Sequence, residues 1–100
     1  MDQNKLIKNC KIGKGTKVWN FVNLYGCEIG EDCIGGSFTE IQEGVKIGNK
    51  VKVESHAFIC EGVEIEDNVL IGHHAVFVNA KYPRSVNKKG QLQSKLDWEP

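Results

Sequence analysis

The sequence lacks several features that would assign it to a simple class. No apolar run is long enough to cross a membrane, and the polar, mixed-charge start of the chain is unlike a secretory signal. Thirteen basic and thirteen acidic residues cancel, so bulk charge provides no affinity for nucleic acid. These absences indicate a cytoplasmic protein with neither a membrane nor a nucleic-acid partner.

Proline, arginine and paired cysteines are scarce as well. There are only two prolines, and Arg84 is the single arginine of the chain. The four cysteines form no Cys-x-x-Cys pair and show no metal-ligand spacing. We therefore interpret them as small buried hydrophobic residues in a reducing compartment.

What the sequence does contain is a repeat of six residues. From position 29 onward every sixth residue is large and apolar except at one glycine, and the residue two positions earlier is small or β-branched. The first series is Ile29, Gly35, Ile41, Ile47, Val53, Ile59, Ile65, Ile71 and Phe77, and the second is Cys27, Cys33, Thr39, Val45, Val51, Ala57, Val63, Val69 and Ala75. Upstream the pattern runs one residue out of phase, at Ile12, Val18 and Leu24, and residues 25–27 absorb the shift.

A period of six fits neither an α-helix nor one long strand, because their side-chain faces recur every 3.6 and every two residues. Two inward side chains followed by glycine or a polar residue instead predict a short strand and a turn. Three such units close a triangular coil, and parallel pairing stacks successive coils about 4.8 Å apart. The repeat therefore predicts an all-β chain, a parallel β-helix of about four coils within residues 1–79.

The recurring Ile/Val-Gly-x-x-x-x unit resembles the hexapeptide-repeat transferases, which implies a left-handed β-helix. Residues 58–73, the Phe-x-Asn of residues 77–79, Pro83-Arg84 and Trp98-Glu99 are similar to one branch of that family. This branch contains the N-acetyltransferases of nucleotide-linked 3-amino sugars, of the dTDP-3-amino-3,6-dideoxyhexose and UDP-3-amino-glucuronate type. The resemblance implies acetyl transfer from acetyl-CoA, as co-substrate, to a sugar amine for cell-surface polysaccharide precursors. It also implies a homotrimer with sites between subunits.

Because successive coils stack, residues eighteen positions apart lie one above another and form columns of side chains. Glu43, Glu61 and Asn79 are eighteen residues apart and fall into one column. Carboxylates stacked in this way disfavour each other's ionisation, so one of them could act as a base near neutral pH. The alternative is that the exposed glutamates point into water and take no part in chemistry.

A second column contains His56 and His74, with Phe38 below them and His73 one residue before His74. Stacked histidines can accept a proton or contact a substrate. They can also bind a metal ion if a partner subunit supplies a further ligand. Packing of the two rings on Phe38 is the alternative.

The resemblance adds roles to these candidates. Glu61 matches an acidic position that faces the sugar pocket, and we expect it to accept the proton or orient the amine. Asn79 matches the asparagine that opens the loop over the sugar site, although Ala80 stands where aspartate is usual. Arg84 would pair with the pyrophosphate.

The remaining candidates have no defined role in the family. His56 and His74 lie near the same pocket and are grouped with Glu61 as catalytic candidates. Glu43 and His73 join Asn79 and Arg84 as substrate-binding candidates, and no metal ligands are expected.

Residues 80–100 have no six-residue repeat and are predominantly basic. We expect an excursion loop or tail, either solvated or reaching a phosphate at a neighbouring subunit. Nothing after Phe77 is typical of a capping element. The tail could fold back and cover the last coil with Tyr82, Leu92, Leu96 and Trp98, but we favour the alternative that further coils follow in a longer protein. In the family such coils form much of the CoA groove, and the 100 residues are therefore expected to hold the sugar half of a site without a complete CoA half.

Two other classes stay open. One is a non-catalytic trimeric β-helix module, which binding of acetyl-CoA or a nucleotide sugar would distinguish from the acetyltransferase. The other is a γ-carbonic-anhydrase-like metal enzyme, which shares the fold but needs an arginine near its zinc. No arginine precedes Arg84, and an assay for bound zinc would test this class.

Overall fold

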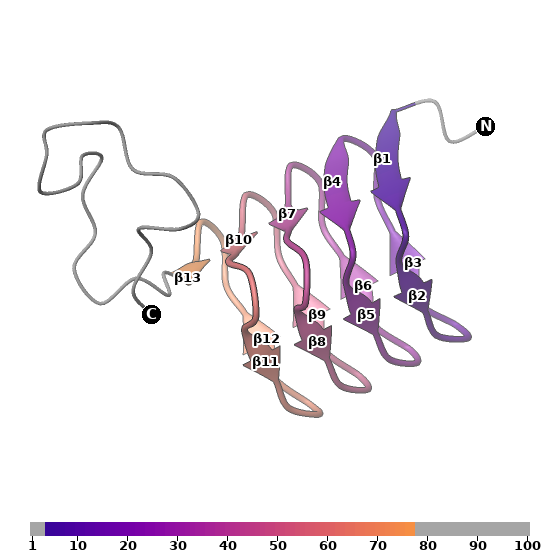
Figure 1. Ribbon diagram of the computed structural model, residues 1–100. Helices are drawn as coiled ribbons and strands as arrows, with labels where there is room; N and C mark the ends of the chain where they lie inside the picture. Colours follow the sequence, from indigo (N-terminus) through magenta and orange to yellow (C-terminus); the bar gives the residue numbers. More distant parts are fainter. Residues whose placement is uncertain (1–3, 78–100) are drawn as a thin grey trace, which may run out of the picture.

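Residues 4–77, which the computed structural model describes, form thirteen short strands in three parallel sheets (Figure 1). Sheet A contains β1 (Lys5–Lys8), β4 (Val22–Tyr25), β7 (Glu40–Ile41), β10 (Phe58–Ile59) and β13 (Val76–Phe77). Sheet B contains β2 (Lys11–Ile12), β5 (Glu28–Ile29), β8 (Lys46–Ile47) and β11 (Glu64–Ile65). Sheet C contains β3 (Lys17–Val18), β6 (Ile34–Gly35), β9 (Lys52–Val53) and β12 (Leu70–Ile71).

The chain visits sheets A, B and C in turn and then returns to sheet A one level higher. Strands β1 to β12 make four complete coils, and β13 begins a fifth. The expected left-handed parallel β-helix is confirmed. Within the described part of the chain, no helix is long and apolar enough to span a membrane.

The register between coils changes once, at the turn that the repeat identified. In sheet A, Leu24 pairs with Ile41 seventeen residues later, whereas Ile41 pairs with Ile59 eighteen residues later. The turn from Leu24 to Cys27 is one residue shorter than the turn from Ile41 to Val45. The predicted shift at residues 25–27 is therefore confirmed, and it explains why the first coils run out of phase.

Both series of repeat positions point into the coil and form one apolar core. Its buried members are Val22, Leu24, Cys27, Ile29, Cys33, Ile41, Val45, Ile47, Val51, Val53, Ala57, Ile59, Ile65 and Ile71. The prediction is wrong for Ile12 and Val69, each 37% exposed. They lie near the two ends of the described stack, where fewer coils cover them. The cysteine prediction holds for Cys27 and Cys33, while Cys10 and Cys60 are only partly buried.

Three corners join the sheets, and each is a turn with one residue in the left-handed backbone region. We call the turns from sheet A to B corner A, from B to C corner B, and from C to A corner C. At corner C the left-handed residues are Phe21, Phe38, His56 and His74, with φ between 59° and 63°. Bulky residues rarely adopt this conformation, and it aligns four rings at one corner.

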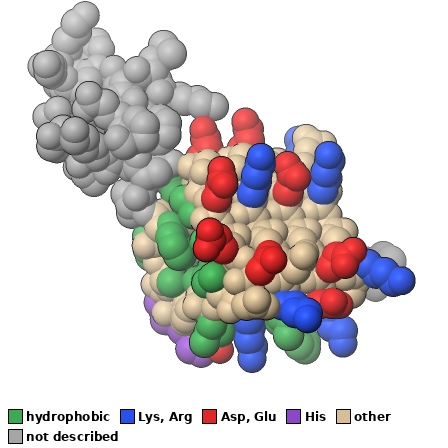
Figure 2. Space-filling view, turned by 90° about the horizontal axis from the view of Figure 1, so that it is seen from below, with side chains coloured by type: hydrophobic (Ala, Val, Ile, Leu, Met, Phe, Trp, Pro, Cys, Tyr) green, Lys and Arg blue, Asp and Glu red, His purple; other side chains and the backbone are tan. Residues whose placement is uncertain are grey.

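The outward residues of the sheets differ in character. Sheet B presents alternating charges, Lys11, Glu28, Lys46 and Glu64, in neighbouring strands. Sheets A and C present exposed apolar side chains, among them Ile34, Leu70 and Val76. Figure 2 shows mixed acidic and basic side chains over one side, while histidines lie at an edge beside hydrophobic residues. The charged face suits water, whereas the apolar faces suit contact with another protein surface.

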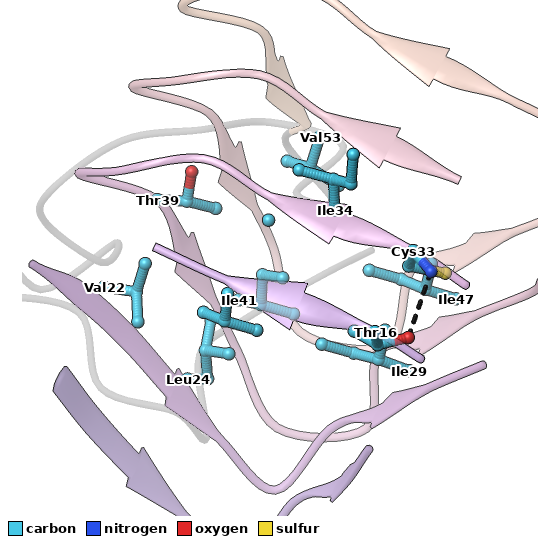
Figure 3. A pocket seen from close by; sticks show the side chains of 12 residues that line it. Thr16, Val22, Leu24, Ile29, Cys33, Ile34, Thr39, Ile41, Ile47 and Val53 are labelled. Atoms are coloured by element: carbon cyan, nitrogen blue, oxygen red, sulfur yellow. Dashed lines mark hydrogen bonds between the residues drawn. The ribbon is translucent and has the colours of Figure 1, made fainter. Parts of the chain in front are cut away.

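A small cavity interrupts the core beside Gly35, the one repeat position without a side chain. Its volume is about 10 Å³, and its lining includes Thr16, Val53 and Thr39 (Figure 3). Thr16 Oγ1 accepts a hydrogen bond from the Cys33 backbone N–H (3.0 Å). Thr39 Oγ1 has no hydrogen-bond partner among residues 4–77, although Thr39 is only 2% exposed.

Replacement of this buried hydroxyl should stabilise the fold. An unsatisfied buried polar group costs about 1–3 kcal/mol, so Thr39→Val is expected to raise the free energy of unfolding by about 1 kcal/mol. Thr39→Ser, which keeps the hydroxyl and removes the methyl, should lower it. Urea unfolding of the three proteins measures the difference. A Thr39→Val protein less stable than wild type would show that the hydroxyl is satisfied.

Candidate functional site

A hydrogen-bonded polar network links three coils along the edge of sheet A that leads into corner A. Tyr25 Oη donates to Glu40 Oε2 (2.9 Å), and Gln42 Nε2 donates to the same oxygen (3.1 Å). Gln42 Oε1 in turn accepts the backbone N–H of Glu61 (3.1 Å). Because both ends of the Gln42 amide are engaged, this side chain fixes the start of the Glu61 turn relative to the Glu40 carboxylate.

Tyr25 acts as the donor of this network. Partial burial raises the pKa of Tyr25 above its ordinary value, and the hydrogen bond to the Glu40 carboxylate raises it further. The phenol therefore keeps its proton at neutral pH and continues to donate to Glu40. The Glu61 carboxylate adds to the same rise through its charge, which indicates that it lies within electrostatic reach of the phenol.

The predicted column of Glu43 and Glu61 is present at corner A. The Gly62 backbone N–H donates to the Glu43 carbonyl (3.2 Å), so the two turns stack directly. Glu43 is exposed and Glu61 is partly buried. Asn79, the third predicted member, lies outside the described residues.

Corner C carries a ladder of four aromatic rings. The ring centroids of His56 and His74 are 4.7 Å apart, and those of Phe38 and His56 are 5.0 Å apart. Phe21 extends the ladder at 5.4 Å from Phe38 with nearly parallel rings. The stacking of the histidines on Phe38 is confirmed. Both histidines are exposed, so their ring nitrogens are also accessible to a substrate.

A hollow of about 250 Å³ lies beside this ladder. Its lining includes Gly36, Trp19 from the coil below and Glu54 from the coil above. Lys52 and His73 contribute basic groups to its lining, and His73 Nε2 lies 3.5 Å from Glu54 Oε1. The hollow thus combines an aromatic wall with groups that can meet an anion.

The structure does not bring all the predicted catalytic residues together within one chain. His56 precedes β10 at corner C, whereas Glu61 follows β10 at corner A, so they lie at opposite ends of this strand. The reason is that successive turns of a hexapeptide repeat fall at different corners of the triangular coil. Arg84, like Asn79, lies outside the described residues.

Sequence reasoning missed two sets of residues. Tyr25, Glu40 and Gln42 were not identified, because their contacts join positions 15, 2 and 19 residues apart rather than one column. Phe21 was missed because it lies seventeen, not eighteen, residues before Phe38. The one-residue phase shift could have identified Phe21, because equivalent residues of coils 1, 2 and 3 in sheet A are seventeen rather than eighteen positions apart.

Metal binding by the stacked histidines would need ligands from outside residues 4–77. Among residues 4–77, no three His, Cys, Asp or Glu side chains are grouped so that they could hold a metal ion.

Comparison with known proteins agrees with this geometry. Residues 44–79 match the family model described as bacterial transferase hexapeptide, six repeats. Residues 44–79 are therefore similar to the hexapeptide repeats of this transferase family. The matched hexapeptides contain five of the predicted site residues: His56, Glu61, His73, His74 and Asn79.

One curated relative aligns with most of the chain. Over 90 residues, or 84% of this chain, the sequence is 31% identical to the bifunctional protein GlmU of Aromatoleum aromaticum. The chain spans only 18% of the length of that relative. The similarity therefore concerns one segment of a much longer protein.

Proposed function

We propose that the protein takes part in acetyl transfer from acetyl-CoA to the amine of a nucleotide-linked amino sugar in the cytoplasm. The observation that carries this proposal is the corner A network, in which Gln42 joins the Glu40 carboxylate and Tyr25 to the start of the Glu61 turn. Of these residues, Glu61 lies within the range that matches the transferase hexapeptide model. Such an edge offers several hydrogen-bond acceptors to the hydroxyl and amino groups of a sugar.

In the proposed reaction the neutral sugar amine attacks the thioester carbonyl and forms a carbon–nitrogen bond, the carbon–sulfur bond breaks to release CoA as its thiolate, and the nitrogen loses one proton. Glu61 accepts that proton directly or through a water, while Gln42 holds the Glu61 turn in place. His56 and His74 contact the substrate from corner C, and Glu43 and His73 bind its polar groups. Alignment of the two substrates supplies most of the remaining rate enhancement.

We further propose a homotrimer in which corner C of one chain packs beside corner A of the next. The apolar surface supports this arrangement, because corner C and its flanking sheets expose large hydrophobic side chains: Trp19, Phe21, Ile34, Phe38, Leu70 and Val76. Their burial between chains would remove this apolar area from water. It would also place His56 and His74 of one chain beside Glu61 of its neighbour, whereas within one chain His56 and Glu61 lie at opposite ends of β10.

Calorimetric titration tests the proposed ligand. The purified chain should bind a dTDP- or UDP-linked 3-amino sugar, and Glu61→Gln or Asn79→Ala should weaken binding by about tenfold or more, since a lost charged hydrogen bond costs about 1.5–3 kcal/mol. Glu64→Gln is the matched control, because Glu64 is exposed on the charged face of sheet B and should leave binding unchanged.

A separate titration with acetyl-CoA tests the second substrate. Binding of both ligands supports the acetyltransferase. A folded chain that binds neither ligand would contradict the proposal and identify a non-catalytic β-helix module.

A further inference from the structure

Two thiols outside the proposed site lie in contact near the N-terminal end of the β-helix. Cys27 Sγ donates to Cys10 Sγ at 3.3 Å, and Cys10 Sγ donates to the Lys8 carbonyl at 3.4 Å. The residues on either side of the pair are held in register, Lys8 with Tyr25 and Lys11 with Glu28. The two cysteines thus occupy equivalent positions in adjacent coils, one directly above the other.

We propose that Cys10 and Cys27 form a redox modification site that a low-molecular-weight disulfide, such as glutathione disulfide, converts to an intramolecular disulfide bond. Adjacent parallel strands lie about 4.8 Å apart, which falls within the range of Cα separations, about 4.4–6.8 Å, that a disulfide bridges. The sulfurs need to close only from 3.3 Å to about 2.05 Å. Small side-chain rotations within a paired backbone can supply this movement.

The two sulfurs have different roles in the exchange. Cys10 is partly exposed, so its thiol reaches the external disulfide first. It loses its proton and attacks one sulfur of that disulfide, which forms a mixed disulfide and releases one thiol. Cys27 then loses its proton and attacks the Cys10 sulfur, which releases the second thiol. The net change oxidises two protein thiols and reduces one external disulfide to two thiols.

Cys27 suits the second role. It is only 1% exposed, and burial together with the neighbouring Cys10 raises its pKa to about 12. The Cys27 thiol therefore stays protonated and does not compete with Cys10 for the external disulfide; its contact with Cys10 Sγ places it to attack once the mixed disulfide has formed. The other buried cysteine is directed elsewhere, because Cys33 Sγ donates to the Gly48 carbonyl (3.1 Å) at corner B.

The bond would fasten the least buried coil of the described chain to its neighbour. Three of the four residues of β1 and both residues of β2 are exposed, and among the described strands this first coil pairs with coil 2 alone. A covalent link between coils 1 and 2 restricts separation of the first coil, so oxidation should raise the resistance of the N-terminal end to unfolding and proteolysis.

Oxidation of the whole chain tests this site. Treatment with glutathione disulfide under native conditions should remove two titratable thiols and lower the mass by about 2 Da, and the thermal midpoint should rise by about 5 °C. Cleavage after lysine leaves Cys27 and Cys33 in one peptide, whereas cleavage after glutamate at Glu28 and Glu31 separates them. The glutamate digest should show Cys10 joined to Cys27.

Two cysteine variants distinguish a Cys10–Cys27 bond from other disulfides. A Cys33→Ala, Cys60→Ala double variant retains only the proposed pair and should still lose both thiols. Cys10→Ser in wild type changes a partly exposed residue and should abolish the bond without unfolding the chain. A stable mixed disulfide at Cys10, a bond to Cys33 or Cys60, or a bond between chains would each overturn the proposal.

Discussion

Mixed trimers of two binding-deficient variants should recover about a quarter of the nucleotide-sugar sites of wild-type trimers. The two variants are Glu61→Gln at corner A and His74→Ala at corner C. A site that takes the histidine from one chain and the glutamate from the next is intact only when the Glu61→Gln chain supplies the histidine and the His74→Ala chain supplies the glutamate. Random assembly of equal amounts produces this arrangement at about one interface in four.

The measurement is the number of sites per trimer, obtained by calorimetry after co-expression of the two chains with different tags. Each homotrimer alone should bind weakly, so recovered sites report mixed interfaces. The matched control combines His56→Ala with His74→Ala. Both residues lie in one ladder of one chain, so no mixed interface can restore the pair.

Two outcomes would contradict the shared site. If the mixed trimers bind no better than the homotrimers, the glutamate and the histidines do not act together across an interface. If the chains are monomeric by light scattering, the proposed trimer itself is wrong. Loss of binding by Glu61→Gln in that monomer would still assign Glu61 to a sugar site within one chain.

The same glycine-to-alanine substitution should have opposite effects at two positions of coil 2. At Gly30 a Cβ would lie 2.6 Å from the Gly48 carbonyl oxygen and 2.7 Å from its carbon, both in the backbone of the next coil. At Gly35 it would meet only the methyl groups of Val18, at 3.7 and 3.8 Å, beside the core cavity. We expect Gly30→Ala to lower the free energy of unfolding by about 2 kcal/mol. Gly35→Ala should raise it by about 0.5–1 kcal/mol.

Each variant is the control for the other. The substitution restricts the unfolded chain equally at both positions, so the difference between the two free energies reflects the folded state alone. Urea unfolding measures both values. Equal destabilisation would contradict the close backbone packing at corner B, and destabilisation by Gly35→Ala would show that the cavity beside Val18 does not accept a methyl group.

Much of the fold could be predicted from residues 27–77, because the hexapeptide pattern carries it directly. Inward positions such as Ile41 and Ile59 recur in phase, and parallel pairing then places them one above the other. The phase shift at residues 25–27 was visible as well, since a shorter turn changes the spacing of apolar residues. The burial of Val69 was predicted wrongly, because periodicity predicts which side a residue faces but not how many coils cover it.

The candidate site could be predicted only in part. The column of His56 on Phe38 follows from spacing, because stacked turns repeat every eighteen residues. The contacts of Tyr25 with Glu40 and of Gln42 with the Glu61 backbone do not, because they join neighbouring columns and depend on side-chain direction. The spacing of the repeat also did not predict that His56 and Glu61 lie at opposite ends of β10.

The sequence by itself determined the coil, since a six-residue alternation of inward apolar and turn residues can bury its core in one way, by stacking parallel strands. It also determined which residues share a column, because that depends on spacing alone. Only the tertiary structure decided which corner each column occupies, how the Gln42 amide joins Glu40 to Glu61, and that the Cys10 and Cys27 thiols touch. The physical reason is that these contacts form between coils and across corners, where side-chain rotamers and local turn length, rather than the repeat, set the distances.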